Sequence, residues 1–227
     1  QKTQTGMLPD SLFRAGIPRL LRQRLDEIAA VDPGQVAERE QAFLAIMRAG
    51  PVAEVPELAN EQHYEVPAAF FETVLGSQRK YSCAFWPDGV THVDEAEEEA
   101  LSLTCRHAGL ENGQRILELG CGWGSLTLYM ARRYPDSEIT AVSNSTSQAA
   151  FIRAQLESEG LRNVSIVTAD MNVFQTDERF DRVVSVEMFE HMRNYHALFN
   201  RINTWLEPDG RFFMHIFCHR DTAYAFE

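Results

Sequence analysis

The chain has 227 residues, of which 44% are hydrophobic and 24% are charged, so it can bury the core of one domain with a small appendage. Its formal net charge of −12 disfavours a nucleic-acid backbone or an anionic membrane surface as the main partner. A small amine-containing ligand fits this charge, although many cytoplasmic enzymes are equally acidic. No apolar stretch approaches the roughly 20 residues of a membrane-spanning helix, and the first residues lack the apolar core of a secretion signal. We therefore expect a cytoplasmic protein.

Residues 1–62 are predicted to form an N-terminal helical region. Apolar residues recur at helical spacing within residues 17–31, which predicts a first helix. In a second helix within residues 32–50, Asp32 can act as the cap, Pro33 suits the first turn and Gly50 suits the end. A linker punctuated by prolines follows.

The next part of the chain is predicted to contain two helices with an aromatic loop between them. The first helix lies within residues 65–76 and ends at Gly76. The loop "KYSCAFWPDGV" (80–90) precedes a helix within residues 91–110, whose acidic first turns complement the helix dipole. We expect the acidic residues of this helix on a solvated face: Glu95, Glu97, Glu98 and Glu99.

From residue 113 onward, short apolar strands alternate with amphipathic helices. Such alternation indicates parallel strands joined by crossover helices. The fold class is therefore α/β, with a doubly wound, mostly parallel sheet in a core domain of residues 63–227. Strands are expected within 114–122, 137–144, 163–170, 180–189 and 211–219, and helices within 123–135, 145–160 and 195–210.

The cysteines are scattered and form no C-x-x-C pair. This spacing predicts free thiols, and it disfavours both a disulfide framework and a cysteine-rich metal site. We expect no resident metal. The four residues are Cys83, Cys105, Cys121 and Cys218.

A glycine-rich turn, "ILELGCGWGS", follows the first predicted strand. Gly120, Gly122 and Gly124 allow the backbone to pass close to a ligand, although a tight turn without a ligand is the plainer alternative. A dinucleotide site needs G-x-G-x-x-G and an acid near the end of the second strand, where this chain has Ser143 and Asn144. Hydride transfer with NAD is therefore the poorer interpretation. The G-x-G-x-G spacing after a glutamate resembles the S-adenosylmethionine turn of class I methyltransferases.

Two further segments can reach the same crevice. Ser145 and Gln148 fit an S-x-x-Q capping box, which is a structural alternative to a ligand role for Gln148. Asp170 follows the third strand and can accept a hydrogen bond from an adenine amino group, with Met171 beside the ring. Helix capping or loop solvation is the alternative for Asp170.

The segment "VEMFEHMRNYH" (186–196) places an unusual density of charge after the fourth strand. Glu187 lies at the carboxyl end of that strand, where open α/β sheets bind ligands. Glu190 and His191 can accept the proton of a reacting amine, because an amine attacks only as its free base. Alternatively, they cap the turn before the next helix.

Taken together, these stretches resemble the cyclopropane-fatty-acid-synthase-like branch of class I S-adenosylmethionine-dependent methyltransferases. The matching stretches appear in family order: "HYEVPAAFF", "KYSCAFW", "LELGCGWGS", "NSTSQ", "VEMFEHMRNY" and "HIFCH". "AVSNSTSQ", "FEHMRNY" and "HIFCHRDTAYAFE" are closest to the coclaurine-type alkaloid N-methyltransferases. The resemblance covers roughly residues 60–227 and implies a Rossmann-like fold, S-adenosylmethionine as cofactor and S-adenosylhomocysteine as product.

The resemblance also implies roles by position. It places five groups of residues: Tyr81 and Ser82 at the methionine part of the cofactor, Gly120 and Gly122 beneath the cofactor, Ser143, Asn144 and Gln148 near ribose and adenosine, Asp170 and Met171 at adenine, and Glu187, Glu190 and His191 at the methyl acceptor.

Two departures from the family pattern leave alternatives open. The family's sheet ordinarily continues with a sixth and a seventh strand, so we expect either a truncated chain or further residues downstream. Cys83, Glu190 and His215 match positions that hold a bicarbonate base in cyclopropane synthases. N-methylation of a small amine is thus the leading hypothesis, and methyl or methylene transfer to an unsaturated lipid is the alternative. An NAD-dependent oxidoreductase and a cofactor-binding protein without activity rank lower, and the oligomeric state is not predicted.

Overall fold

The computed structural model describes residues 10–28, 33–54 and 68–219. The chain forms two compact units, one of residues 1–46 with 218–227 and the other of residues 47–217. In the first unit, α1 (Asp10–Ile28) confirms the first predicted helix but begins seven residues earlier than expected. α2 (Pro33–Ala49) begins at the predicted proline and runs into the second unit, whereas the predicted cap Asp32 lies outside the described residues. Within the described ranges, no helix combines the length and the apolar character needed to cross a membrane.

The second unit is built around a parallel sheet of five strands in the order β3-β2-β1-β4-β5. This order is that of a doubly wound fold, which confirms the predicted fold class. The strands are β1 (Arg115–Leu119), β2 (Glu138–Ser143), β3 (Val164–Thr168), β4 (Phe180–Val186) and β5 (Leu206–His215). The helices are α4 (Ala68–Val74), α5 (Val93–His107), α6 (Ser125–Arg133), α7 (Thr146–Glu159) and α8 (Tyr195–Trp205).

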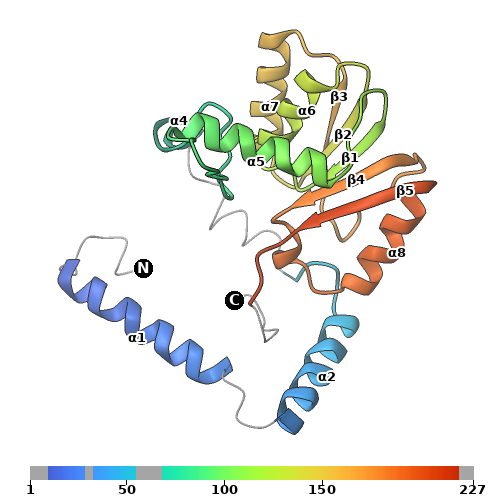
Figure 1. Ribbon diagram of the computed structural model, residues 1–227. Helices are drawn as coiled ribbons and strands as arrows, with labels where there is room; N and C mark the ends of the chain where they lie inside the picture. Colours follow the sequence, from blue (N-terminus) through green and yellow to red (C-terminus); the bar gives the residue numbers. More distant parts are fainter. Residues whose placement is uncertain (1–9, 29–32, 55–67, 220–227) are drawn as a thin grey trace. The chain divides into compact units, whose positions relative to one another are not determined.

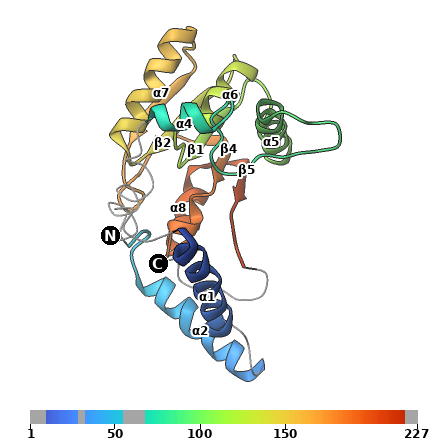
Figure 2. The ribbon, with the colours of Figure 1, turned by 90° about the vertical axis from the view of Figure 1, so that its left-hand side faces the viewer.

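Successive side chains of the central strands point to opposite faces of the sheet and pack into two separate apolar cores. Ile116 of β1 packs with residues of α5, α6 and α7, whereas its neighbour Leu117 packs with residues of α8 and of the segment after β3. Both views accordingly show the strands between α7 and α8 (Figures 1 and 2). Burial of both faces explains why adjacent residues in the middle of each strand are apolar, as at Ile116 and Leu117 of β1 and Val183 and Val184 of β4.

The last strand differs from its predicted bounds of 211–219. α8 ends at Trp205 and Leu206 already pairs with Phe180, so β5 begins five residues earlier. The register shifts between Phe180 and Arg182, and this irregularity accommodates the "EPDG" stretch within the strand. β5 ends at His215, which releases the backbone of Phe217 for a contact with the segment after β4.

All five strands are parallel, so their carboxyl ends meet at one edge of the sheet. β1 has β2 on one side and β4 on the other, which makes the gap beyond their ends the topological switch point. The glycine-rich turn follows β1, and the "EMFEH" segment follows β4 at the same edge. The predicted cofactor and acceptor residues therefore converge where open α/β sheets bind ligands.

Candidate functional site

The glycine-rich turn after β1 is closely packed on both sides. Gly120 and Gly122 have φ of 79° and 53°, in the region that favours glycine. A Cβ on Gly120 would lie 2.8 Å from Met188 Cβ, and one on Gly122 would lie 2.7 Å from Tyr81 Oη. The backbone amides of Gly120 and Cys121 both donate to Val142 O of β2 at 3.0 Å. The turn thus brings the "YS" loop and the segment after β4 together at the end of β1.

The "YS" loop is held by a buried lysine that the sequence analysis missed. Lys80 is only 7% exposed, and its Nζ donates to Ser82 Oγ at 2.6 Å and lies 3.9 Å from Cys83 Sγ. Burial lowers the pKa of Lys80, while the nearby Cys83, Glu187 and Glu97 oppose this shift. Lysine is almost never fully buried without a partner, so the residue type alone does not indicate that Lys80 is buried.

Glu97 of α5 supports the same loop and corrects a prediction. It was expected on a solvated face but is 1% exposed. Its two carboxylate oxygens accept hydrogen bonds from the amides of Gly76 and Gln78 at 2.9 and 3.0 Å. Glu95 and Glu98 are exposed as predicted. A buried carboxylate is tolerated here because it accepts hydrogen bonds from backbone amides between α4 and the "YS" loop.

The residues after β2 form a buried polar cluster. Ser143 Oγ donates to Gln148 Oε1 at 2.9 Å, and Ser145 Oγ accepts from the amide of Gln148 at 3.3 Å. Only this half of the predicted capping box forms, because the amide of Ser145 donates to Ser143 Oγ instead of to Gln148. Gln148 Nε2 is buried and has no hydrogen-bond partner among the described residues. Asn144 is exposed in the same turn.

Asp170 and Met171 lie in the loop after β3. The Asp170 carboxylate accepts from the backbone and side-chain amides of Asn172 at 2.8 and 3.3 Å, a contact within the loop that is neither the helix capping nor the loop solvation given as its alternative. Met171 is 7% exposed and belongs to the apolar core that also contains Val142 and Met188. Their placement at the carboxyl edge agrees with the prediction, and their role at adenine stays a prediction.

Glu187 connects β4 to the candidate acceptor segment through an unusual backbone conformation. Its φ of 51° is uncommon for a residue other than glycine, and such conformations concentrate at functional sites. Its amide donates to His215 O at 2.8 Å, so the sheet ladder fixes this turn. Its carboxylate, Cys83 Sγ and a ring nitrogen of His215 all lie within 4.8 Å of one another. Cys83 and His215 thus meet as the bicarbonate prediction requires, but the carboxylate in this group is Glu187 and not Glu190.

Glu190 and His191 lie in a short 3₁₀ turn, η1 (Phe189–His191). They do not cap α8, because Asn194 Oδ1 accepts the amide of Ala197 at 3.0 Å and is the cap. Glu190 Oε1 accepts the backbone amide of Phe217 after β5. Glu190 Oε2 is buried and has no hydrogen-bond partner among the described residues. One oxygen of Glu190 is therefore anchored and the other is available to a donor.

A second buried carboxylate lies below the glycine-rich turn. Glu118 is 4% exposed, and its Oε2 accepts from Thr127 Oγ1 at 2.5 Å. Burial raises the pKa of Glu118 to about 7, and the Thr127 hydrogen bond opposes the shift. Glu118 therefore changes charge near neutral pH, directly beside the turn.

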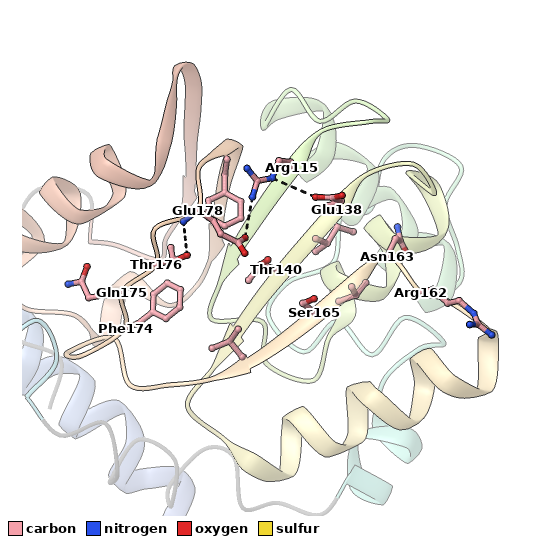
Figure 3. Close-up of a pocket in the computed structure, with 14 residues that line it drawn as sticks. Arg115, Glu138, Thr140, Arg162, Asn163, Ser165, Phe174, Gln175, Thr176 and Glu178 are labelled. Carbon is pink, nitrogen blue, oxygen red and sulfur yellow. Dashed lines mark hydrogen bonds and ion pairs between the residues drawn. The ribbon is translucent and has the colours of Figure 1, made fainter.

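A cavity of about 380 Å³ lies at the opposite edge of the sheet, and none of the predicted site residues lines it (Figure 3). Arg115 and Glu138 are the first residues of β1 and β2, and both line it. Arg115 bridges Glu138 and Glu178 at 3.6 and 3.3 Å. Three of the cavity's four charged lining residues thus pair with one another, and the carboxyl edge remains the candidate site.

Comparison with known proteins assigns the family. The profile of the mycolic acid cyclopropane synthetase family matches residues 54–226. The chain belongs to this family. The chain is similar to (S)-coclaurine N-methyltransferase from Thalictrum flavum subsp. glaucum, which is 36% identical over 228 residues, covering 100% of this chain and 63% of the relative. Cyclopropane-fatty-acyl-phospholipid synthase from Escherichia coli (strain K12) is 36% identical over 160 residues, covering 70% of this chain and 40% of the relative.

A solved member of the family has the same fold. The crystal structure of coclaurine N-methyltransferase bound to N-methylheliamine and S-adenosylhomocysteine superposes with a TM-score of 0.91 at 34% identity. The match covers 98% of this chain and 64% of that structure. The chain therefore has the Rossmann-like methyltransferase fold of the family, and it spans less than two thirds of these N-methyltransferases.

Proposed function

We propose that this chain binds S-adenosylmethionine at the carboxyl edge of its sheet and belongs to an enzyme that methylates the nitrogen of a small amine. The observation that carries the proposal is Glu190, which has one anchored oxygen and one buried oxygen without a partner among the described residues. The family and the named N-methyltransferases support it.

The residues around the glycine-rich turn fit the cofactor. Gly120 and Gly122 have positive φ in the turn at the carboxyl edge of the sheet, where a backbone without side chains can lie close beneath a ligand. Gln148 Nε2 is a buried donor in need of an acceptor, which a ribose oxygen or an adenine ring nitrogen would supply. Tyr81 and Ser82 would hold the methionine part, Ser143, Asn144 and Gln148 the nucleoside, and Asp170 with Met171 the adenine. When bound, S-adenosylmethionine supplies an electrophilic methyl group.

Glu190 and His191 would manage the proton of the acceptor. An amine attacks only when neutral, so a base must select the free amine or take its proton. Anchoring of Oε1 by the Phe217 amide fixes the carboxylate so that Oε2 can accept from an N–H group. Glu187 would add a second negative charge on the approach of a cationic amine. Positioning of this kind lowers the activation barrier of a displacement reaction by several kcal/mol, because the reactants are already held together before they react.

The proposal is tested with Glu190→Gln in the full-length enzyme. Glutamine preserves an oxygen for the Phe217 amide but cannot accept the proton, so kcat should fall about 100-fold. S-adenosylhomocysteine affinity, measured by calorimetry, should change less than about 2-fold because Glu190 makes no proposed contact with the cofactor. The exposed Glu157→Gln on α7 serves as the matched control. Full activity in a Glu190→Gln, His191→Ala double variant would overturn the assignment.

Transfer to a lipid alkene is the second candidate, and the cluster of Cys83, Glu187 and His215 favours it. These three groups lie within 4.8 Å of one another and could hold the base that an alkene reaction needs. The synthase from E. coli is a more partial match than the N-methyltransferase. Labelling of unsaturated phospholipid by a radioactive methyl donor, with no labelling of amines, would move the assignment to this reaction.

The remaining parts of the assignment are proposed from the sequence. We propose a helical region of residues 1–62 attached to a cofactor-binding core of residues 63–227, and a cytoplasmic location. Fractionation of cells that express the full-length protein tests the location directly.

A further inference from the structure

Residues 48–54 comprise the last two residues of α2 and the five residues after it, and they belong to the second compact unit. Val52 and Ala53 are each 3% exposed and belong to the apolar core that contains Met171, Met188 and Phe189. We call residues 48–54 the strap. After Ala49 the strap lies in neither a helix nor the sheet. Its backbone N–H and C=O groups must therefore find hydrogen-bond partners in other segments.

The loop after β3 provides the first set of these hydrogen bonds. Asn172 Oδ1 accepts the amide of Ala53 at 2.9 Å, and Asn172 Nδ2 donates to Ala53 O at 2.8 Å. The same side chain donates to Asp170 Oδ2 at 3.3 Å. Arg201 of α8 fixes this loop further, because its Nη1 donates to Met171 O at 2.7 Å and to Asn172 O at 3.0 Å. One asparagine therefore joins the strap to the proposed adenine residues.

The segment after β4 provides the second set. The amide of Arg193 donates to Val52 O at 2.7 Å. Asn194 Nδ2 donates to Arg48 O at 3.0 Å and to Gly50 O at 2.9 Å. The Arg193 side chain also lies 3.4 Å from Glu54. These bonds begin two residues after His191, so the strap is attached directly to the proposed acceptor segment.

We propose that the strap couples the cofactor side of the site to the acceptor side, with Asn172 and Asn194 as positioning residues. β3 and β4 are not neighbours in the sheet, because β2 and β1 lie between them. The strap spans this gap with hydrogen bonds to the loop after each strand. Ordering of residues 170–172 by a cofactor is thereby transmitted through Ala53 and Val52 to residues 191–194. The inference rests on the proposed function for its role in catalysis, but the mechanical coupling is testable without activity.

Hydrogen exchange of the full-length protein without ligand tests the coupling itself. Asn172→Ala removes both contacts with Ala53, so the amides of residues 191–193 should exchange about 10-fold faster. The matched control is Asn163→Ala, because Asn163 Nδ2 also donates to two backbone carbonyls, at 3.3 and 3.0 Å, but on another side of the unit. Equal exchange of residues 191–193 in the two variants would overturn the coupling, and faster exchange confined to Asn172→Ala supports it.

A double-mutant cycle tests the catalytic consequence. Asn194→Ser keeps a side-chain oxygen to cap α8 but is too short to reach Arg48 O and Gly50 O. Asn172→Ala and Asn194→Ser should each lower kcat/KM for the amine about 10-fold, and the double variant should lower it by about the same factor, because both break one linkage. A loss of about 100-fold in the double variant would show two independent contributions and contradict the proposal. An inactive wild-type enzyme would instead refute the proposed function, and hydrogen exchange would still decide the coupling.

Discussion

Alanine substitutions at three glycines separate backbone strain from loss of space. Gly120, Gly122 and Gly160 all have positive φ, of 79°, 53° and 69°. A Cβ on Gly160 would meet nothing within 4 Å. On Gly122 it would meet the tip of the Tyr81 side chain at 2.7 Å, and on Gly120 it would meet Cβ and Cγ of Met188 at 2.8 Å.

These differences predict a graded loss of stability. Gly160→Ala should lower the free energy of unfolding by about 1 kcal/mol, which is the cost of the left-handed conformation alone. Gly122→Ala should cost about 1–2 kcal/mol, because Tyr81 is 39% exposed and can move its ring away. Gly120→Ala should cost about 3 kcal/mol, because Met188 Cβ lies next to the backbone and cannot move without the backbone.

Urea denaturation of the three variants gives these free energies, and calorimetry gives their affinities for S-adenosylhomocysteine. Gly120→Ala and Gly122→Ala should weaken binding at least about 10-fold, whereas Gly160→Ala should leave it unchanged. The reasoning is wrong if Gly160→Ala is as destabilising as Gly120→Ala, or if Gly122→Ala binds the ligand normally.

Three further substitutions test the buried charges around the site. Glu118 keeps its proton up to about pH 7 in the folded state but releases it near its ordinary pKa of 4.5 in the unfolded state. The free energy of unfolding of the wild-type protein should therefore fall by about 3 kcal/mol as the pH rises from 4.5 to above 7. Glu118→Gln should flatten this pH dependence in urea titrations at pH 5 and 8, and an unchanged slope would contradict the prediction. Glu97→Ala should cost about 3 kcal/mol, because the part-buried amides of Gly76 and Gln78 lose their acceptor and Lys80 loses a nearby negative charge. The exposed Glu98→Ala should cost less than about 0.5 kcal/mol, and similar losses in the two variants would argue against the support assigned to Glu97. Lys80→Met should raise KM for S-adenosylmethionine about 10-fold by releasing Ser82, whereas an unchanged KM in steady-state kinetics would remove Lys80 from the site.

The fold could be predicted because its signals are local. Apolar runs between turn residues located each strand, and their alternation with helices fixed parallel pairing. The start of β5 was missed because Pro208 and Gly210 suggest a turn, whereas tertiary pairing with β4 extends the strand across them. A pairing partner elsewhere in the chain overrode the local signal.

The site was only partly predictable. The glycine-rich turn and the "FEH" segment could be identified from their residue types, and the structure brings both to one edge of the sheet. Burial of Lys80 and Glu97 carries no sequence signal, because charged residues are mostly exposed. The role of Asn172 and Asn194 was equally hidden, because their partners lie 119 and 144 residues away in sequence. Such long-range hydrogen bonds depend on the completed fold.

A competitive methyl-transfer assay shows whether the acceptor is an amine or a lipid. The full-length enzyme receives radioactively labelled S-adenosylmethionine together with a panel of secondary and tertiary amines and vesicles of unsaturated phospholipid. We expect label on an amine nitrogen, with a rate that falls about 100-fold in Glu190→Gln. Label found in the lipid, or on an amine at an undiminished rate in Glu190→Gln, would contradict this expectation.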